Sequence, residues 1–186
     1  MTSIKICGLS RPADIDWINE ARPDYCGFII HVPKSIRSID SGKLHELRFR
    51  LDESITPVGV FVNEPLRSLI SISEEAGLDI IQLHGDESDA DIRQLKESCN
   101  CEIWKALRIG QIKDMDAAAF PHADRLLVDS YVQGLRGGSG KRIAMELLQK
   151  LDVSRLIIAG GICRDNVKEI LALQPYGIDV SSALET

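Results

Sequence analysis

The stretch that decides the fold is RLIIAGG at residues 155–161, read together with GIDVSS at residues 177–182 near the end of the chain. Each is a short apolar run that closes on glycine or serine. Small-residue turns after the last two strands of an alternating strand–helix chain are typical of the phosphate site of a (β/α)8 barrel. The two runs therefore favour a barrel over an open sheet.

Outward from these runs, the rest of the chain repeats the same alternation of apolar strand, turn and helical spacing. Several strands are apolar without alternation, as expected when both faces of a parallel sheet are buried. Helical spacing follows Pro65, the capping pair Ser88 and Asp91, and the candidate cap Asp165, and it recurs at residues 143–151. The six earlier strands are predicted at residues 4–7, 25–30, 57–62, 79–83, 102–109 and 125–130.

Eight strands alternating with helices have two main solutions, an open doubly wound sheet and a closed barrel. No GxGxxG motif follows the first strand, and the glycine-rich turns come late, so the barrel is favoured. We predict a compact (β/α)8 TIM barrel in which residues 1–186 form a single domain. No helical pattern follows the eighth strand, so the final helix is expected to be absent.

Composition excludes several classes of function. The chain has 186 residues, 44% of them hydrophobic and 27% charged, which suits one globular core. Its net charge of −6 argues against nucleic acid or an anionic membrane as partner. No apolar run is long enough to span a membrane and no basic-then-apolar signal opens the chain, so a cytoplasmic protein is expected. The five cysteines and four histidines show no spacing typical of a disulfide framework or a metal site.

Candidate site residues gather where the predicted strands end, which is where barrels carry their function. Taken singly, each has a structural explanation, such as a buried thiol or a turn-capping carboxylate. Their joint placement at one end of one barrel favours a site, since structural needs would spread them over both ends. They are Cys7, Arg37, His84, Asp129, Gly160, Gly161, Ser181 and Ser182.

The same segments resemble a known family from residue 4 to residue 185. They are KICGL, GFII with PKSIR, VGVFVN, QLHGDE, LLVDS with GGSGK, AGGI and IDVSSALE, in that order. This series is similar to the phosphoribosylanthranilate isomerases of tryptophan biosynthesis. Single motifs such as GGSG are common, whereas KICGL, QLHG, VDS and DVSS in register are specific.

The resemblance implies an Amadori rearrangement of N-(5-phosphoribosyl)anthranilate to 1-(2-carboxyphenylamino)-1-deoxyribulose 5-phosphate, with no cofactor and no metal. It makes Asp129 the general acid and Cys7 the general base. A free thiol has a pKa near ~8.5, so a neighbouring positive charge would raise the fraction of thiolate. By the same resemblance Arg37 meets the anthranilate carboxylate, and His84 lines the pocket without transferring a proton. Gly138 and Gly140 belong to a loop that closes over the substrate. The phosphate turns are formed by Gly160, Gly161, Ser181 and Ser182.

Two departures from the family pattern bear on binding. Ala183 stands where glycine is usual in the phosphate turn, and Ile36 stands where proline is common, in a stretch one residue longer before Arg37. The alternatives are an enzyme of another reaction type on a phosphate-binding barrel, and a barrel that binds a sugar phosphate without catalysis. The expected partner is the small-molecule substrate, and the expected assembly is a monomer or a homodimer.

Overall fold

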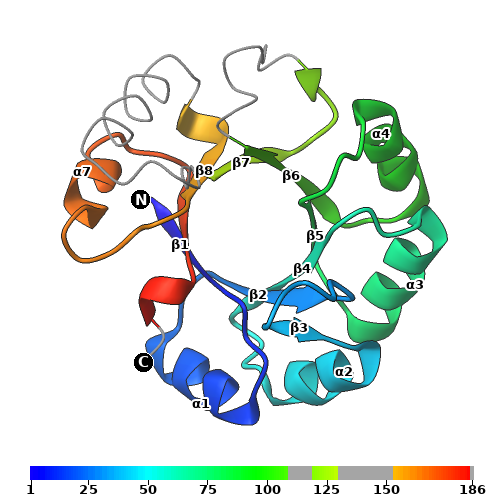
Figure 1. The fold of residues 1–186 in the computed structure, drawn as a ribbon, viewed down its shortest axis with the longest axis horizontal. Helices are drawn as coiled ribbons and strands as arrows, with labels where there is room; N and C mark the ends of the chain where they lie inside the picture. The colour runs from blue at the N-terminus through cyan, green and yellow to red at the C-terminus, as the bar shows by residue number, and fades with distance from the viewer. Residues whose placement is uncertain (109–118, 130–152, 185–186) are drawn as a thin grey trace.

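A closed parallel barrel with helices on its outside forms the fold of the computed structural model, which describes residues 1–108, 119–129 and 153–184 (Figure 1). The strands run in the order β1-β9-β8-β7-β6-β5-β4-β2, and β1 also pairs with β2, which closes the sheet. Because the first strand pairs with both the second and the last, the two ends of the sequence meet in one wall. The predicted (β/α)8 barrel is confirmed.

All eight predicted barrel strands are present where the apolar runs lie. They are β1 (Ser3–Cys7), β2 (Tyr25–Ile30), β4 (Thr56–Phe61), β5 (Ile80–Leu83), β6 (Glu102–Arg108), β7 (Arg125–Asp129), β8 (Leu156–Ala159) and β9 (Gly177–Val180). The described helices are α1 (Pro12–Ala21), α2 (Ser41–Arg50), α3 (Leu66–Ala76), α4 (Asp89–Ser98) and α7 (Val167–Leu171). None of these helices is long and apolar enough to cross a membrane.

One strand was not predicted. The two-residue strand β3 (Ser38–Ile39) pairs in parallel with the end of β2, with Ile29 opposite Ser38. A strand of two residues carries no periodic signal, which is why the pattern of apolar residues misses it. Its effect is to draw the chain back to β2, so that residues 31–37 form a closed loop above the barrel wall.

Two hydrophobic layers hold the barrel together. The larger layer lies between the sheet and the helices, and the smaller one fills the barrel interior around the fully buried Trp104. Tyr25 packs edge-on against Trp104 with ring centroids 5.1 Å apart, and its hydroxyl lies 2.6 Å from that of Tyr176. Tyr25 begins β2 and Tyr176 precedes β9, so these rings fill the end of the barrel where the strands start. The opposite end remains available for a site.

The helix boundaries follow the capping residues, with two small corrections. Ser88 and Asp91 form the predicted capping box of α4, in which the Ser88 hydroxyl accepts the N–H of Asp91 and the Asp91 carboxylate accepts the N–H of Ser88. Pro65, predicted inside the first turn of α3, is instead its N-cap. The predicted cap Asp165 is wrong by one residue, because Asn166 precedes α7 and its side chain bridges Cys163 and Gly161.

Two further predictions fall at the edges of what the structure describes. The predicted helix at residues 143–151 lies outside the described residues. After β9 the described chain forms a short 3-10 helix, Ser182–Leu184.

Candidate active site

A cavity of about 490 Å³ opens at the carboxyl ends of the barrel strands. Every candidate residue within the described chain lines it: Cys7, Arg37, His84, Asp129, Gly160, Gly161, Ser181 and Ser182. Side chains from β1, β7 and β9 therefore face one space, together with His84 just after β5, a loop residue and two turns. The two loop glycines of the prediction, Gly138 and Gly140, lie outside the described residues.

Cys7 is the last residue of β1, and the glycine after it is required by the site. Gly8 has a φ of 93°, a backbone conformation that residues with a side chain rarely adopt. Its N–H donates to the carbonyl of Gly27 at 2.9 Å. A Cβ atom at Gly8 would lie 2.5 Å from Arg37 Cδ and 3.2 Å from Ser181 Oγ. Cys7 thus ends the strand with a thiol, and the absence of a side chain at Gly8 leaves room for the Arg37 side chain.

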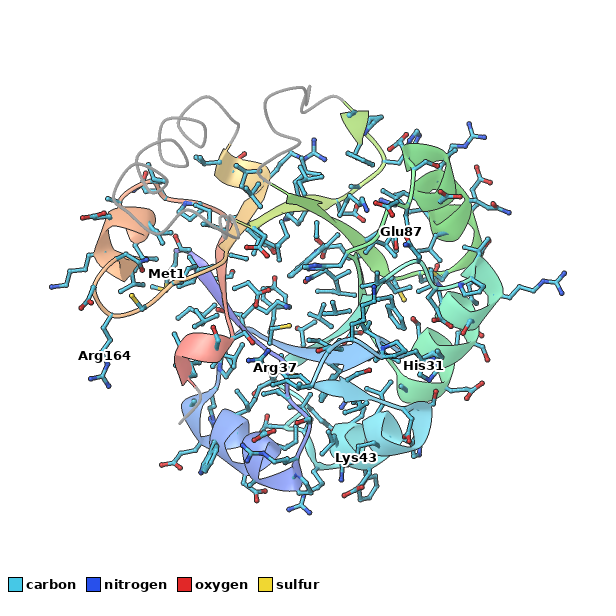
Figure 2. The ribbon with its side chains drawn as sticks, in the orientation of Figure 1. Met1, His31, Arg37, Lys43, Glu87 and Arg164 are labelled. Atoms are coloured by element: carbon cyan, nitrogen blue, oxygen red, sulfur yellow. The ribbon has the colours of Figure 1, made fainter. Side chains whose placement is uncertain are left out.

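Arg37 reaches the cavity from the loop between β2 and β3, at the inner edge of the barrel (Figure 2). The loop is braced within itself, since the Val32 N–H donates to Ser38 Oγ at 2.8 Å and the Arg37 N–H to Ser35 Oγ at 3.2 Å. Ile36, which stands where the family commonly has proline, is 90% exposed. This departure therefore leaves the inward direction of Arg37 intact.

Two small-residue turns close the cavity beside β8 and β9. Gly160 and Gly161 have φ values of 83° and 67°, and a Cβ at Gly161 would meet nothing within 4 Å. The carbonyl of Gly161 accepts the side-chain N–H of Asn166 at 2.9 Å, which fixes this turn to the start of α7. Ala183 lies in the 3-10 helix Ser182–Leu184, a right-handed conformation in which a methyl group causes no backbone strain. Backbone N–H groups and hydroxyls in turns of this kind suit phosphate oxygens.

A buried ion pair below the cavity was not predicted. Lys5 Nζ lies 2.9 Å from Asp179 Oδ2, and the two side chains are 1% and 8% exposed. Burial opposes the charge of Lys5, but Asp179 and Cys7 outweigh it and the pKa of Lys5 is raised. Burial raises the pKa of the Asp179 carboxyl, with Lys5 opposing the rise and Asp129 adding to it. The signal was present in the sequence, as one charge of each sign within the apolar runs IKIC and GIDV.

Burial also raises the pKa of the Cys7 thiol, and Lys5 acts against it. Lys5 lowers the pKa both by its charge and by a hydrogen bond to the thiol, while Asp179 contributes in the opposite direction. The chemistry of Cys7 is therefore decided by a balance between an apolar surrounding and one nearby ammonium group.

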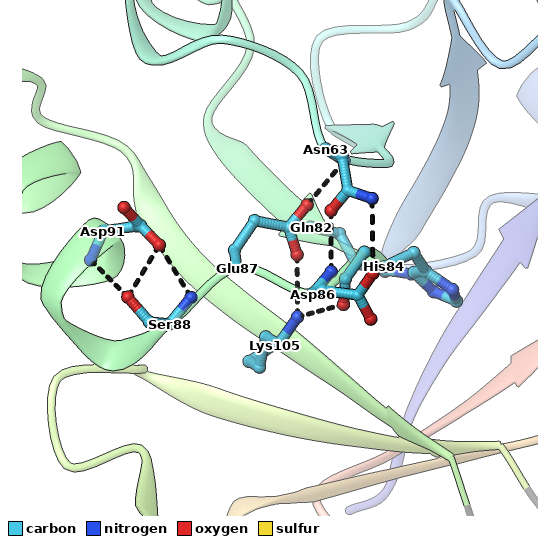
Figure 3. Close-up of polar contacts among 9 residues, drawn as sticks. Asn63, Gln82, His84, Asp86, Glu87, Ser88, Asp91 and Lys105 are labelled. Carbon is cyan, nitrogen blue, oxygen red and sulfur yellow. Dashed lines mark hydrogen bonds and ion pairs between the residues drawn. The ribbon is translucent and has the colours of Figure 1, made fainter.

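His84 enters the cavity from the end of β5 and is held by its neighbour. Gln82 Nε2 lies 2.5 Å from His84 Nε2, and both residues are drawn in Figure 3. The His84 N–H donates to the carbonyl of Phe61 at 2.8 Å. These two contacts fix both the ring and the backbone of His84. Sequence reasoning placed His84 at the rim and did not find the contact with Gln82.

The loop after His84 is anchored by a second buried ion pair, seen in Figure 3. Lys105 Nζ lies 2.7 Å from Glu87 Oε2 and 2.7 Å from the carbonyl of Gly85, and its side chain is 4% exposed. The other oxygen of Glu87 accepts the N–H of Asn63 at 2.8 Å. β4, β5 and β6 are thereby joined at their carboxyl ends, which makes the wall that carries His84 rigid.

A thiol, a carboxylate, a guanidinium and two phosphate-type turns in one barrel cavity define a class of protein. They are the parts of a (β/α)8-barrel enzyme that binds a phosphorylated small molecule and moves protons on it. Among the described residues, no group of three or more His, Cys, Asp or Glu side chains is arranged to hold a metal ion.

Comparison with known proteins narrows that class. The family model described as N-(5'-phosphoribosyl)anthranilate (PRA) isomerase matches residues 4–186, and the chain belongs to this family. A relative named N-(5'-phosphoribosyl)anthranilate isomerase from Endomicrobium trichonymphae is 40% identical over 187 residues, covering 100% of this chain and 90% of the relative.

Solved structures of the family share the fold. The TrpF protein from Jonesia denitrificans has a TM-score of 0.85 and 28% identity, with 100% of this chain and 88% of that chain covered. A phosphoribosyl anthranilate isomerase in complex with reduced 1-(o-carboxyphenylamino)-1-deoxyribulose 5-phosphate has a TM-score of 0.82 and 26% identity, with 100% of this chain and 90% of that chain covered.

Proposed function

We propose that this chain isomerises N-(5'-phosphoribosyl)anthranilate to 1-(2-carboxyphenylamino)-1-deoxyribulose 5-phosphate, with Asp129 as general acid and Cys7 as general base. The observation that carries the proposal is that Cys7 and Asp129, from strands β1 and β7, line one cavity with Arg37 and the two small-residue turns. Family membership favours this reaction over the alternative of a barrel that binds a sugar phosphate without catalysis.

The first half of the reaction opens the ribose ring. Asp129 gives a proton to the ring oxygen as the bond between that oxygen and C1 breaks. The nitrogen lone pair of the anthranilate forms the C1=N double bond, which leaves an iminium ion. A general acid aligned on the leaving oxygen typically accelerates such a step by ~10²–10⁴-fold.

The second half moves a proton from carbon to carbon. The Cys7 thiolate removes the proton on C2, and the electron pair of that bond forms the C1=C2 double bond of an enolamine. The Cys7 thiol then returns the proton to C1 of the enolamine, and the Asp129 carboxylate takes the proton of the C2 hydroxyl, which gives the ketone and restores both groups. The positive iminium forms beside Cys7, so the proton on C2 becomes acidic at the moment the base must take it.

The other cavity residues bind and orient the substrate in this proposal. The planar guanidinium of Arg37 pairs with the planar anthranilate carboxylate, a geometry that favours two parallel hydrogen bonds. Backbone N–H groups at Gly160 and Gly161, with the hydroxyls of Ser181 and Ser182, bind the phosphate. His84, oriented by its neighbour on β5, lines the pocket without transferring a proton.

The setting of the reaction is also part of the proposal. Residues 1–186 act as a single domain, a proposal supported by the pairing of β1 with β9 in one sheet. The assembly is a monomer or a homodimer, and the partner is the small-molecule substrate. The five free cysteines suit the reducing cytoplasm.

The test follows the loss of substrate fluorescence with the purified chain and two variants. Cys7→Ala and Asp129→Ala are each expected to lower kcat by ~10²–10⁴-fold while the substrate still binds. Cys99→Ala, at the end of α4, and Asp16→Ala, on α1, are the matched controls and should retain wild-type turnover. Turnover near the wild-type value in either site variant would remove that residue from the mechanism.

A further inference from the structure

The proposed reaction requires Cys7 as a thiolate, yet its surroundings disfavour that form. Burial raises the pKa of the thiol. A charged base inside a barrel needs a neighbour of opposite charge, and the sequence did not identify one. The structure supplies a candidate two residues earlier on the same strand.

Lys5 and Cys7 point into the same side of the barrel wall, since side chains two residues apart on a strand share a face. Opposite Cys7 on β2 stands Gly27, in register with it. A Cβ atom at Gly27 would lie 2.7 Å from Cys7 Sγ and 2.9 Å from Lys5 Nζ. The sulfur and the ammonium are therefore close neighbours, and both occupy the space that the missing side chain leaves.

Asp179 holds Lys5 in that space from the other side. It lies in register with Lys5 on β9, and its Oδ2 accepts the ammonium at 2.9 Å. Its second oxygen, Oδ1, is buried with no hydrogen-bond partner among the described residues. Asp179 thus fixes the position of the ammonium and keeps it charged, while it also adds a negative charge near the sulfur.

We propose that Lys5 is a positioning residue of the active site, whose buried ammonium, held by Asp179, stabilises the Cys7 thiolate that removes the substrate proton. The inference rests on the proposed role of Cys7 as the base. The thiol proton leaves Cys7 for solvent before the substrate binds, and the sulfur then takes the C2 proton while Lys5 stays protonated throughout.

Several ionisable groups surround Cys7, and the sign of each charge determines whether its removal raises or lowers the pKa of the thiol. Those on the packed strands and around the cavity are Lys5 on β1, Cys26 on β2, His84 just after β5, Asp129 on β7, Asp179 on β9, and Arg37 on the loop. Of these, Lys5 is the group that lowers the pKa of Cys7, and Asp179 raises it. Removing the two charges one at a time should therefore move the titration of Cys7 in opposite directions.

The experiment measures the rate at which iodoacetamide alkylates Cys7 as a function of pH, by mass spectrometry of the Cys7 peptide, without substrate. Lys5→Met is expected to move the midpoint upward by about one pH unit or more. Asp179→Asn keeps a hydrogen-bond acceptor for the ammonium and removes the negative charge near the sulfur, so it is expected to move the midpoint downward. The rising limb of kcat/KM against pH should shift in the same two directions. Midpoints that stay in place, or move together in one direction, would overturn the inference.

Two further readouts keep the outcome decisive. Should Lys5→Met fail to fold, the double variant Lys5→Met/Asp179→Leu leaves no buried charge unpaired, and it should show a smaller upward shift. An unshifted double variant would contradict the role of Lys5. The alkylation assay needs no turnover, so it separates the two proposals. If Cys7→Ala remains active while the midpoints shift as expected, the proposed base is wrong and the electrostatic coupling stands.

Discussion

Gly27 shows at the scale of one residue how a missing side chain shapes this site. Replacing it with alanine places a methyl group against Cys7 Sγ and Lys5 Nζ. We expect Gly27→Ala to lower the free energy of unfolding by about 1–3 kcal/mol through overpacking, and to lower kcat by displacing the thiol. Urea unfolding and steady-state kinetics measure the two effects.

Gly42→Ala is the matched control for that change. Gly42 lies in α2, where an added Cβ would meet only Asp40 Oδ1, at 3.5 Å. Alanine is favoured over glycine in a helix by up to about 1 kcal/mol, so this variant should be slightly more stable and fully active. A Gly27→Ala protein that behaves like Gly42→Ala would show that the space beside Cys7 is not needed.

Arg37 gives a second prediction at this scale. Lysine keeps the charge but loses the planar pair of donors, so Arg37→Lys should raise KM about tenfold or more with kcat little changed. Lys34→Arg, on the same loop, is the control and should leave KM unaltered. An Arg37→Lys variant with the wild-type KM would exclude contact with the substrate carboxylate.

Site residues at the carboxyl ends of strands are the ones that the sequence predicts well. Cys7, His84 and Asp129 close apolar runs, and parallel strands bring such positions to one rim. Lys5 and Asp179 were overlooked because a charged residue within a predicted strand is usually assigned to the solvent-exposed face of that strand. Only the pairing of β1 with β9 shows that the two charges meet.

At the scale of elements, the capping of α4 offers a direct test. The Ser88 hydroxyl accepts the N–H of Asp91, one of the donors that a helix start leaves unpaired. Ser88→Ala should cost about 0.5–2 kcal/mol in the free energy of unfolding. Ser98→Ala removes a hydroxyl at the other end of the same helix, where it donates to the carbonyl of Gln94. That control should be neutral or slightly stabilising. Equal losses in both variants would contradict a specific cap.

The elements were largely predictable, and the exceptions have a physical cause. Eight buried parallel strands leave eight apolar runs, each long enough to be distinguished from the helices between them. The strand β3 was missed because two residues cannot show a period. The start of α7 was misplaced by one residue because Asp165 and Asn166 are both residue types that cap helices. The helix begins at Val167, so its N-cap is Asn166, whose side chain contacts Cys163 and Gly161 rather than the helix.

For the whole molecule, the pH dependence of stability follows from carboxylates that folding keeps ionised. Burial opposes ionisation of Asp14, but hydrogen bonds from the Arg11 side chain and from backbone N–H groups prevail, so its pKa is lowered. Hydrogen bonds from Ser88 likewise lower the pKa of Asp91. A group with a lowered folded pKa contributes stability above its unfolded pKa, near ~3.9, and loses it as the pH falls through the folded value.

The free energy of unfolding should therefore fall as the pH drops below about 4. Asp14→Asn should weaken this dependence, because the group whose titration drives it is gone. Urea unfolding at pH 7 and pH 3 measures the difference, with Asp16→Asn on the exposed face of the same helix as control. A wild-type protein equally stable at both pH values would contradict the expectation.

The proposed mechanism requires one cavity in which a thiol and a carboxylate act on the same sugar. A crystal structure of this chain with reduced 1-(o-carboxyphenylamino)-1-deoxyribulose 5-phosphate tests it most directly. The phosphate is predicted to lie on the turns at Gly160–Gly161 and Ser181–Ser182, the carboxylate on Arg37, and the ribulose carbons between Cys7 Sγ and the Asp129 carboxylate. A ligand whose sugar touches only one of those two side chains, or whose phosphate binds elsewhere, would contradict the account.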